Sequence, residues 1–150
     1  MSNKSTISFH YIVEPFFFPD RNRLKDFIHF LFINEKRALQ TLSYVFCSDE
    51  YLLEYNKAYL NHNTLTDIIS FELSGKNEPI IGDIYISIDR IRENATLHQT
   101  TFTKELHRVI FHGALHLCGY KDKTKDQQKL MRQKEEEYLK TYFVPRDTVS

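Results

Sequence analysis

The sequence of 150 residues has no tryptophan, only four glycines and only two cysteines, Cys47 and Cys118. Two cysteines are too few for a disulfide framework, and neither lies in a closely spaced pair of the kind that binds a metal, so we expect a reduced interior. Internal repeats and low-complexity segments are also missing. The chain therefore has the features of neither a disulfide scaffold nor a repeat protein.

Long hydrophobic runs are missing as well. No stretch approaches the roughly 20 apolar residues that a membrane-spanning helix needs. The apolar run from Phe9 to Phe18 is interrupted by His10, Glu14 and Pro15, which argues against a signal peptide. We expect a cytoplasmic protein that has no membrane partner.

An excess of charge of either sign is the third absence, because 20 basic residues balance 20 acidic ones. Zero net charge argues against a protein that holds nucleic acid through its overall electrostatic field, so any basic surface must be local. The candidates for nucleic-acid contacts are Lys121, Lys123 and Lys125, although a solvated loop explains such a run equally well.

What the sequence does contain is the composition of a globular protein, with 41% hydrophobic, 14% aromatic and 27% charged residues. Its length fits one domain, residues 1–150, with a proper core. The predicted strands are residues 5–13, 41–46, 66–73 and 80–88, and the predicted helices are residues 20–35, 48–60, 89–98, 103–117 and 124–140. The predicted helix caps are Asp20, Ser48, Asp89 and the capping box of Thr124 and Gln127. Interleaved helices and strands indicate an α/β or α+β sandwich.

The helix predicted at residues 103–117 is apolar nearly all round near its end. Between Val109 and Leu117 the only polar side chains are those of His112 and His116, which lie four residues apart on one face. Two buried imidazoles need a shared partner, because an unsatisfied buried polar group costs roughly 1–3 kcal/mol. A metal ion meets that need.

Two residues that follow this pair, Gly119 and Asp122, strengthen the interpretation. Gly119 can end the helix in a left-handed conformation and turn the chain back, which brings Asp122 to the return. The layout His-x-x-x-His-x-x-Gly-x-x-ligand delivers three donors to one side of a tetrahedral ion and leaves the fourth position open for water. We therefore predict one metal ion per chain, bound by His112, His116 and Asp122. The alternatives are histidines bonded to backbone groups and an Asp122 that is a surface or cap residue.

The residues from His112 to Tyr120 resemble the signature of the YbeY family, bacterial zinc-dependent endoribonucleases that act as rRNA maturation factors. Three further segments resemble motifs of this family, and their order and spacing agree over about residues 40–140. They are Thr66-Asp67-Ile68-Ile69-Ser70-Phe71, Gly82-Asp83-Ile84-Tyr85-Ile86-Ser87 and Met131-Arg132-x-x-Glu135.

The resemblance implies an α+β fold with a small mixed sheet of about four strands, about five surrounding helices and a zincin-like metal helix. It implies a single-strand-specific, metal-dependent endoribonuclease that matures the 3′ end of small-subunit (16S) rRNA and serves ribosome quality control. The implied metal is one Zn²⁺ per chain, and His112 and His116 would act in catalysis through the water bound to it. The implied partners are an rRNA precursor and the small ribosomal subunit, with no organic cofactor.

Two positions depart from the family pattern. Asp122 stands where the family usually has a third histidine, and Leu60 stands where it usually has an arginine that serves catalysis. The departure at Leu60 leaves open which group is the general base and how strong the nuclease activity is.

A substrate groove is expected between the metal helix and the sheet. Its candidate wall residues are Ser70, Asp83 and Ser87. The alternative for all three is an ordinary strand or turn position.

Two other functions fit parts of the pattern. A zinc peptidase uses the same spacing of metal ligands, but it keeps a glutamate as general base directly after the first histidine, where this chain has Gly113. A ribosome assembly factor with a structural metal would explain Leu60 and the neutral net charge. Three visible ligands without a fourth argue against a purely structural metal.

Overall fold

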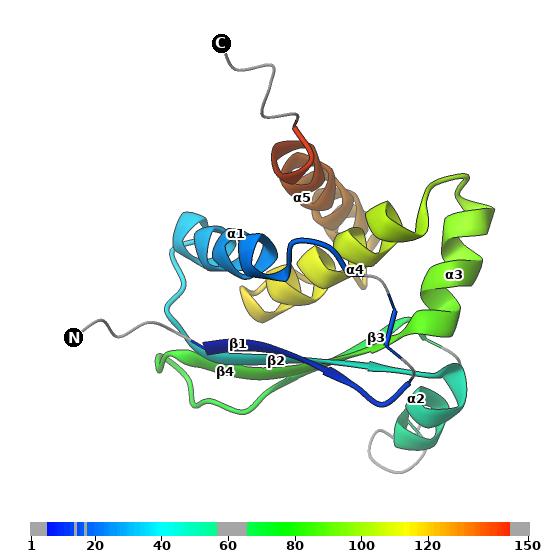
Figure 1. Cartoon of the computed structure of the whole chain (residues 1–150). Helices are drawn as coiled ribbons and strands as arrows, with labels where there is room; N and C mark the ends of the chain where they lie inside the picture. The colour runs from blue at the N-terminus through cyan, green and yellow to red at the C-terminus, as the bar shows by residue number, and fades with distance from the viewer. Residues whose placement is uncertain (1–5, 14, 17, 57–65, 145–150) are drawn as a thin grey trace.

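The structure is a computed structural model of the chain, and it describes residues 6–13, 15–16, 18–56 and 66–144. The strands in these ranges are β1 (Thr6–Tyr11), β2 (Leu39–Cys47), β3 (Ile68–Glu72) and β4 (Ile80–Ser87). The helices are α1 (Arg21–Asn34), α2 (Asp49–Tyr55), α3 (Ile88–Leu97), α4 (Phe102–Leu117) and α5 (Lys125–Tyr142) (Figure 1). Every predicted element is present. The predicted end of the second helix, Leu60, lies outside the described residues.

The four strands form one mixed sheet in the order β1-β2-β4-β3. β1 pairs with β2 and β2 pairs with β4 in parallel, whereas β3 runs antiparallel to β4. Parallel neighbours need a crossover connection, and α1 lies in the connection between β1 and β2. The predicted α+β fold, a small mixed sheet with helices around it, is confirmed.

The two faces of the sheet meet different helices. Figure 1 shows α1, α4 and α5 on one side of the sheet and α2 on the other. The first face is apolar and fully buried along β2 and β4: Leu42, Tyr44, Phe46, Ile84 and Ile86. Side chains alternate along a strand, so Asp83, Tyr85 and Ser87 belong to the second face. Contacts of Tyr85 with Tyr51 and Tyr55 of α2 agree with this placement.

α4 lies very close to the first face. A Cβ atom added at Gly113 would stand 2.8 Å from Cδ1 of Ile84 and 2.9 Å from Cδ1 of Ile68. The Tyr44 hydroxyl donates a hydrogen bond of 2.9 Å to the Ile110 carbonyl, which fastens the helix to β2. Glycine at position 113 is therefore what allows this helix to approach the sheet.

The opposite side of α4 is covered by helices. Phe111 is fully buried and packs against Phe27 of α1 and Tyr142 of α5. A helix enclosed by a sheet on one side and helices on the other is apolar nearly all round, as the sequence predicted. The two histidines of interest are thus carried by an enclosed helix.

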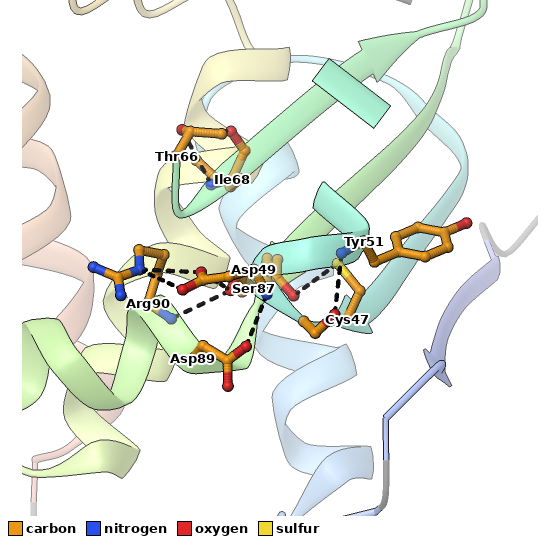
Figure 2. A network of polar contacts seen from close by, with 10 residues as sticks. Cys47, Asp49, Tyr51, Thr66, Ile68, Ser87, Asp89 and Arg90 are labelled. Atoms are coloured by element: carbon orange, nitrogen blue, oxygen red, sulfur yellow. Dashed lines mark hydrogen bonds and ion pairs between the residues drawn. The ribbon is translucent and has the colours of Figure 1, made fainter. Parts of the chain in front are cut away.

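α2 and α3 share a polar network at the ends of β2 and β4 (Figure 2). The Ser87 hydroxyl accepts a hydrogen bond from the Arg90 N–H at 3.2 Å, which caps α3, and it donates to Asp49 at 2.7 Å. Arg90 Nε donates to the same carboxylate at 3.0 Å. The prediction that Asp89 caps α3 is wrong, because this residue lies inside the first turn of the helix. It accepts instead from the Asp49 N–H at 2.8 Å.

The other predicted caps have different outcomes. Asp20 stands at the N-cap position of α1, but its backbone is left-handed (φ 54°) and its side chain makes no capping hydrogen bond. Ser48 caps α2 through the Tyr51 N–H, and Thr124 with Gln127 forms the predicted capping box of α5.

Among the described helices, none is both long and apolar enough to cross a membrane.

Candidate metal centre

The end of α4 is closed by a left-handed residue. The Gly119 N–H donates to the His116 carbonyl, and the Tyr120 N–H donates to the Leu115 carbonyl at 3.1 Å. Gly119 has a φ of +111°, which an L side chain rarely adopts. The predicted left-handed helix end is confirmed, and it returns Asp122 to the side of the helix.

His112, His116 and Asp122 gather at this end of α4. Nε2 of His112 lies 3.3 Å from Oδ2 of Asp122. The two imidazole rings are nearly parallel, with centroids 6.2 Å apart and an interplanar angle of 13°. The side chains of His112 and Asp122 are 18% and 41% exposed, and His116 is exposed. The structure thus brings the three predicted ligands to one place that solvent reaches.

The chemistry of these side chains, and not their arrangement, supports a metal site. Across the described ranges, no group of three or more histidine, cysteine, aspartate and glutamate side chains meets the geometry of a metal site. Two imidazoles and a carboxylate are nevertheless a donor set that zinc takes. Nε2 of His112 faces Asp122, whereas Nδ1 of the same ring is occupied by another carboxylate. Nε2 is therefore the nitrogen left for a metal, and the zinc site stays a prediction.

The carboxylate on the other side of the ring belongs to Glu135 of α5, which is only 3% exposed. Nδ1 of His112 donates to its Oε2 at 2.5 Å. Arg108 donates to Oε1 at 2.9 Å and also donates two hydrogen bonds to Glu105, at 3.1 and 2.5 Å. A chain of hydrogen bonds from Glu105 through Arg108 and Glu135 to His112 therefore connects α4 and α5.

The charges in this chain shift one another's proton affinities. Burial opposes protonation of His112, but the hydrogen bond and charge of Glu135, together with nearby Asp67 and Asp122, outweigh it and raise the pKa of His112. Burial raises the pKa of Glu135, but its bonds to His112 and Arg108 outweigh that effect, so the pKa of Glu135 is lowered. Glu135 is therefore an anion at neutral pH and can only accept hydrogen bonds.

The pKa of His116 is lowered, whereas that of His112 is raised. Burial lowers the pKa of His116, and the nearby charges of His112 and Lys123 lower it further, while Asp122 acts in the other direction. The ring is therefore neutral at physiological pH. A neutral imidazole is the form that binds a metal ion.

Asp67 is a third acidic group near His112, after Asp122 and Glu135. It directly precedes β3, where its carbonyl accepts a hydrogen bond from the Ser87 N–H at 3.0 Å. Burial raises the pKa of Asp67, and the attraction of His112 and Arg108 only partly offsets this. A carboxyl group with a raised pKa beside a candidate centre is suited to holding or moving a proton.

Sequence reasoning assigned no role to Asp67, Arg108 or Glu135. Asp67 and Glu135 lie in the segments that resemble family motifs, and this was the only signal in the sequence that pointed to them. Arg108 carried no such signal beyond its position one turn before His112. Leu60, where the family usually has an arginine, lies outside the described residues.

The predicted RNA contacts lie beside the ligands. Lys121, Lys123 and Lys125 are all exposed, on the connection from α4 to α5 and at the start of α5. This connection also carries Asp122, and Lys123 acts electrostatically on His116. The structure thus places positive charge next to the predicted metal ligands, and the contact with RNA stays a prediction.

The three predicted groove residues do not share one face. Ser70 pairs with Ile84, so it lies on the sheet face that meets α4. Asp83 and Ser87 lie on the opposite face, because they alternate with Ile84 and Ile86 along β4. The hydroxyl of Ser87 is also committed to capping α3. The structure therefore does not bring Asp83 and Ser87 to the metal helix, and the groove wall predicted from them needs correction.

The seam between α4 and the sheet is filled at Gly113, so the expected groove is closed at that point. Among the described residues, a surface groove instead separates the first turns of α4 from α5. Its lining includes Lys104, Arg108, Arg132 and Lys140. Arg108 lies at the junction between this groove and the buried chain that leads to His112.

The sequence resembles proteins of one family. A family model described as Endoribonuclease YbeY matches residues 20–143. A relative from Flavobacterium psychrophilum called Endoribonuclease YbeY is 47% identical over 138 residues, covering 92% of this chain and 97% of the relative. Relatives of the same name from Flavobacterium johnsoniae and Christiangramia forsetii are 43% and 50% identical, covering 92% and 74% of this chain and 98% and 77% of the relatives.

One solved structure shares the fold. The solution structure of TM1509 from Thermotoga maritima matches with a TM-score of 0.60, and the match covers 91% of this chain and 89% of that chain. Its sequence identity of 24% is low, so the likeness bears on the fold alone.

Proposed function

Because this chain belongs to the YbeY endoribonuclease family, we propose that it is an endoribonuclease whose active centre is a zinc site formed by His112, His116 and Asp122. One observation carries the proposal: Nε2 of His112 contacts Asp122 beside His116, at an end of α4 that solvent reaches. The substrate is single-stranded RNA, and the cellular role is maturation of the 3′ end of small-subunit rRNA and ribosome quality control.

Different residues of the chain have different roles in the proposed reaction. When bound, zinc supplies a Lewis acid that polarises a phosphoryl oxygen and lowers the pKa of water. His112, His116 and Asp122 hold the ion, and Asp67, with its raised pKa, is the candidate for moving a proton. The lysines on the connection after α4 contact the phosphates that flank the cleaved bond.

The neutral net charge bears on how the substrate is recognised. A few local lysines give a weak, salt-dependent grip on RNA. Recognition of the rRNA precursor therefore depends on the small ribosomal subunit as a partner, which presents the RNA to the centre. This partnership predicts low intrinsic affinity for free RNA.

A peptidase activity is disfavoured by the packing of Gly113. Zinc peptidases place a glutamate directly after the first histidine as general base. In this chain a single Cβ atom at that position would come within 3 Å of Ile84 and Ile68. The side chain of a glutamate has no space there unless the helix moves away from the sheet.

The proposal is tested by incubating zinc-loaded protein with a single-stranded and a hairpin RNA. We expect cleavage of the single strand, loss of cleavage with a chelator, and a loss of at least about 100-fold in rate for His116→Ala, because one ligand of the metal is gone. Circular dichroism shows whether the variant is folded. The control is His10→Ala, which removes a histidine from the sheet face opposite α4.

Two outcomes contradict the nuclease proposal. Cleavage by His116→Ala at the wild-type rate would mean that the reaction does not use this centre. Zinc binding and ribosome binding without any cleavage would select the alternative, an assembly factor with a structural metal. Leu60, in place of the family's usual arginine, is the sequence feature that favours this alternative.

A further inference from the structure

A chain of charged side chains, formed by Glu105, Arg108 and Glu135, leads to His112. Glu105 and Glu135 are 2% and 3% exposed, and Arg108 links them. Building on the proposed zinc site, we infer that Glu135 and Arg108 are positioning residues that hold the His112 ring with Nε2 free and directed toward Asp122.

The direction of the hydrogen bonds supports this inference. A guanidinium is permanently charged and can only donate, so Arg108 selects the ionised, accepting form of Glu135. The hydrogen of the contact between His112 and Glu135 then belongs to Nδ1 of the ring. A neutral ring with its proton on Nδ1 carries its lone pair on Nε2, the nitrogen that lies 3.3 Å from Asp122.

The geometry of Arg108 explains why an arginine stands there. Its Nε and Nη2 atoms donate to the two oxygens of Glu105, at 3.1 and 2.5 Å. This paired contact fixes the plane of the guanidinium, and the remaining Nη1 atom donates to Glu135 at 2.9 Å. A lysine has a single nitrogen and cannot reproduce this fork.

The arrangement acts on one of the two histidines. Glu135 contacts His112, whereas the interactions that act on His116 come from Asp122, His112 and Lys123. His112 is therefore the fixed ligand, whose orientation is set before the metal arrives. Outer carboxylates of this kind fix the tautomer of a metal-binding histidine, and their loss costs about 10- to 100-fold in metal affinity.

The test uses Glu135→Gln, which keeps the size of the side chain. The first measurement is the tautomer of His112 in metal-free protein, read from ¹⁵N chemical shifts of labelled histidine at a pH above the raised pKa of His112, where a titration of the same shifts shows the ring to be neutral. We expect wild-type His112 to carry its proton on Nδ1, and the variant to show a mixture of the two tautomers. The second measurement is zinc affinity by calorimetry, where we expect a loss of about 10- to 100-fold.

Glu136→Gln is the matched control, because it makes the same change at the exposed neighbouring position of α5. We expect it to keep the wild-type tautomer and affinity. Arg108→Lys keeps the positive charge but loses the fork, and we expect zinc affinity between those of the wild type and Glu135→Gln. A merely structural link between the helices would lower stability in these variants without changing the tautomer.

The inference is overturned if Glu135→Gln keeps a single Nδ1–H tautomer and binds zinc as tightly as the wild type. A mixed tautomer in the wild-type protein would overturn it too. The tautomer is read without metal or RNA, so this result stands even if the wild type neither binds zinc nor cleaves RNA. Those two failures would count against the proposed function alone.

Discussion

His107 is a buried histidine outside the candidate centre, and its ring is part of the core. It is 1% exposed and stacks on Tyr142, and its Nδ1 donates to the Thr103 carbonyl at 2.7 Å. Burial lowers the pKa of His107 below 6.5, and the charge of Arg23 adds to this effect, although the Thr103 carbonyl acts in the other direction. The folded protein therefore keeps this ring neutral.

A prediction for the pH dependence of stability follows from His107. Its contribution is fully present above the unfolded pKa of about 6.5, and it is lost as the pH falls toward the lower folded pKa, because the unfolded state takes up the proton first. We expect His107→Phe to lose less stability than the wild type between about pH 7.5 and 5.5. Urea unfolding at both pH values measures this, and equal losses in the two proteins would refute it.

At the scale of residues, local geometry decided what could be predicted. His112, His116 and Asp122 could be placed together because one helical turn and one left-handed glycine set their relation. Glu135 could not, because it contacts a histidine 23 residues earlier only through the packing of α5 on α4. Its lowered pKa likewise arises from tertiary contacts, those with His112 and then those with Arg108.

α5 begins with a capping box that fixes where the helix starts. Thr124 accepts from the Gln127 N–H at 3.1 Å, and Gln127 accepts in return from the Thr124 N–H at 3.1 Å. The side chain of Gln127 also accepts from the Lys123 N–H at 3.0 Å, which ties down the connection that carries Asp122. The cap therefore supports both the helix of Glu135 and the loop of the third predicted ligand.

We expect Thr124→Ala to lower the free energy of unfolding by about 1 kcal/mol, because a backbone N–H loses its partner. Thr124→Ser keeps a hydroxyl at the cap and should stay close to the wild type. Urea titration measures both variants, and the slope with denaturant should not change. A loss of the same size in the serine variant would show that the methyl group, and not the cap, stabilises the helix.

At the scale of elements, periodicity was a good guide to where helices and strands lie, and a poor guide to which face each presents. The alternation along β4 was visible in the sequence. Which of its two faces meets α4 depends on the pairing of β4 with β2 and on the approach of Gly113. Asp83 and Ser87 were therefore assigned to the wrong side of the sheet.

At the scale of the whole molecule, the proposed zinc site would couple metal binding to folding. A ligand that binds only the folded state stabilises it by about 2.7 kcal/mol at a free concentration 100 times its dissociation constant. For a chain of this size we expect zinc to raise the melting temperature by about 5–10 °C. Differential scanning fluorimetry with and without zinc measures the shift. His116→Ala should show little of it, and an equal shift in that variant would place the zinc elsewhere.

Residues that meet at the proposed centre lie far apart in the sequence, and this has a consequence for protein synthesis. The ribosome makes the histidine pair of α4 first, and 23 residues separate His112 from Glu135. At about 5–20 residues per second, that interval lasts roughly 1–5 s. A nascent chain halted late in this interval would contain both imidazoles but not the carboxylate that contacts one of them. Translation therefore supplies this carboxylate only after both histidines have been made.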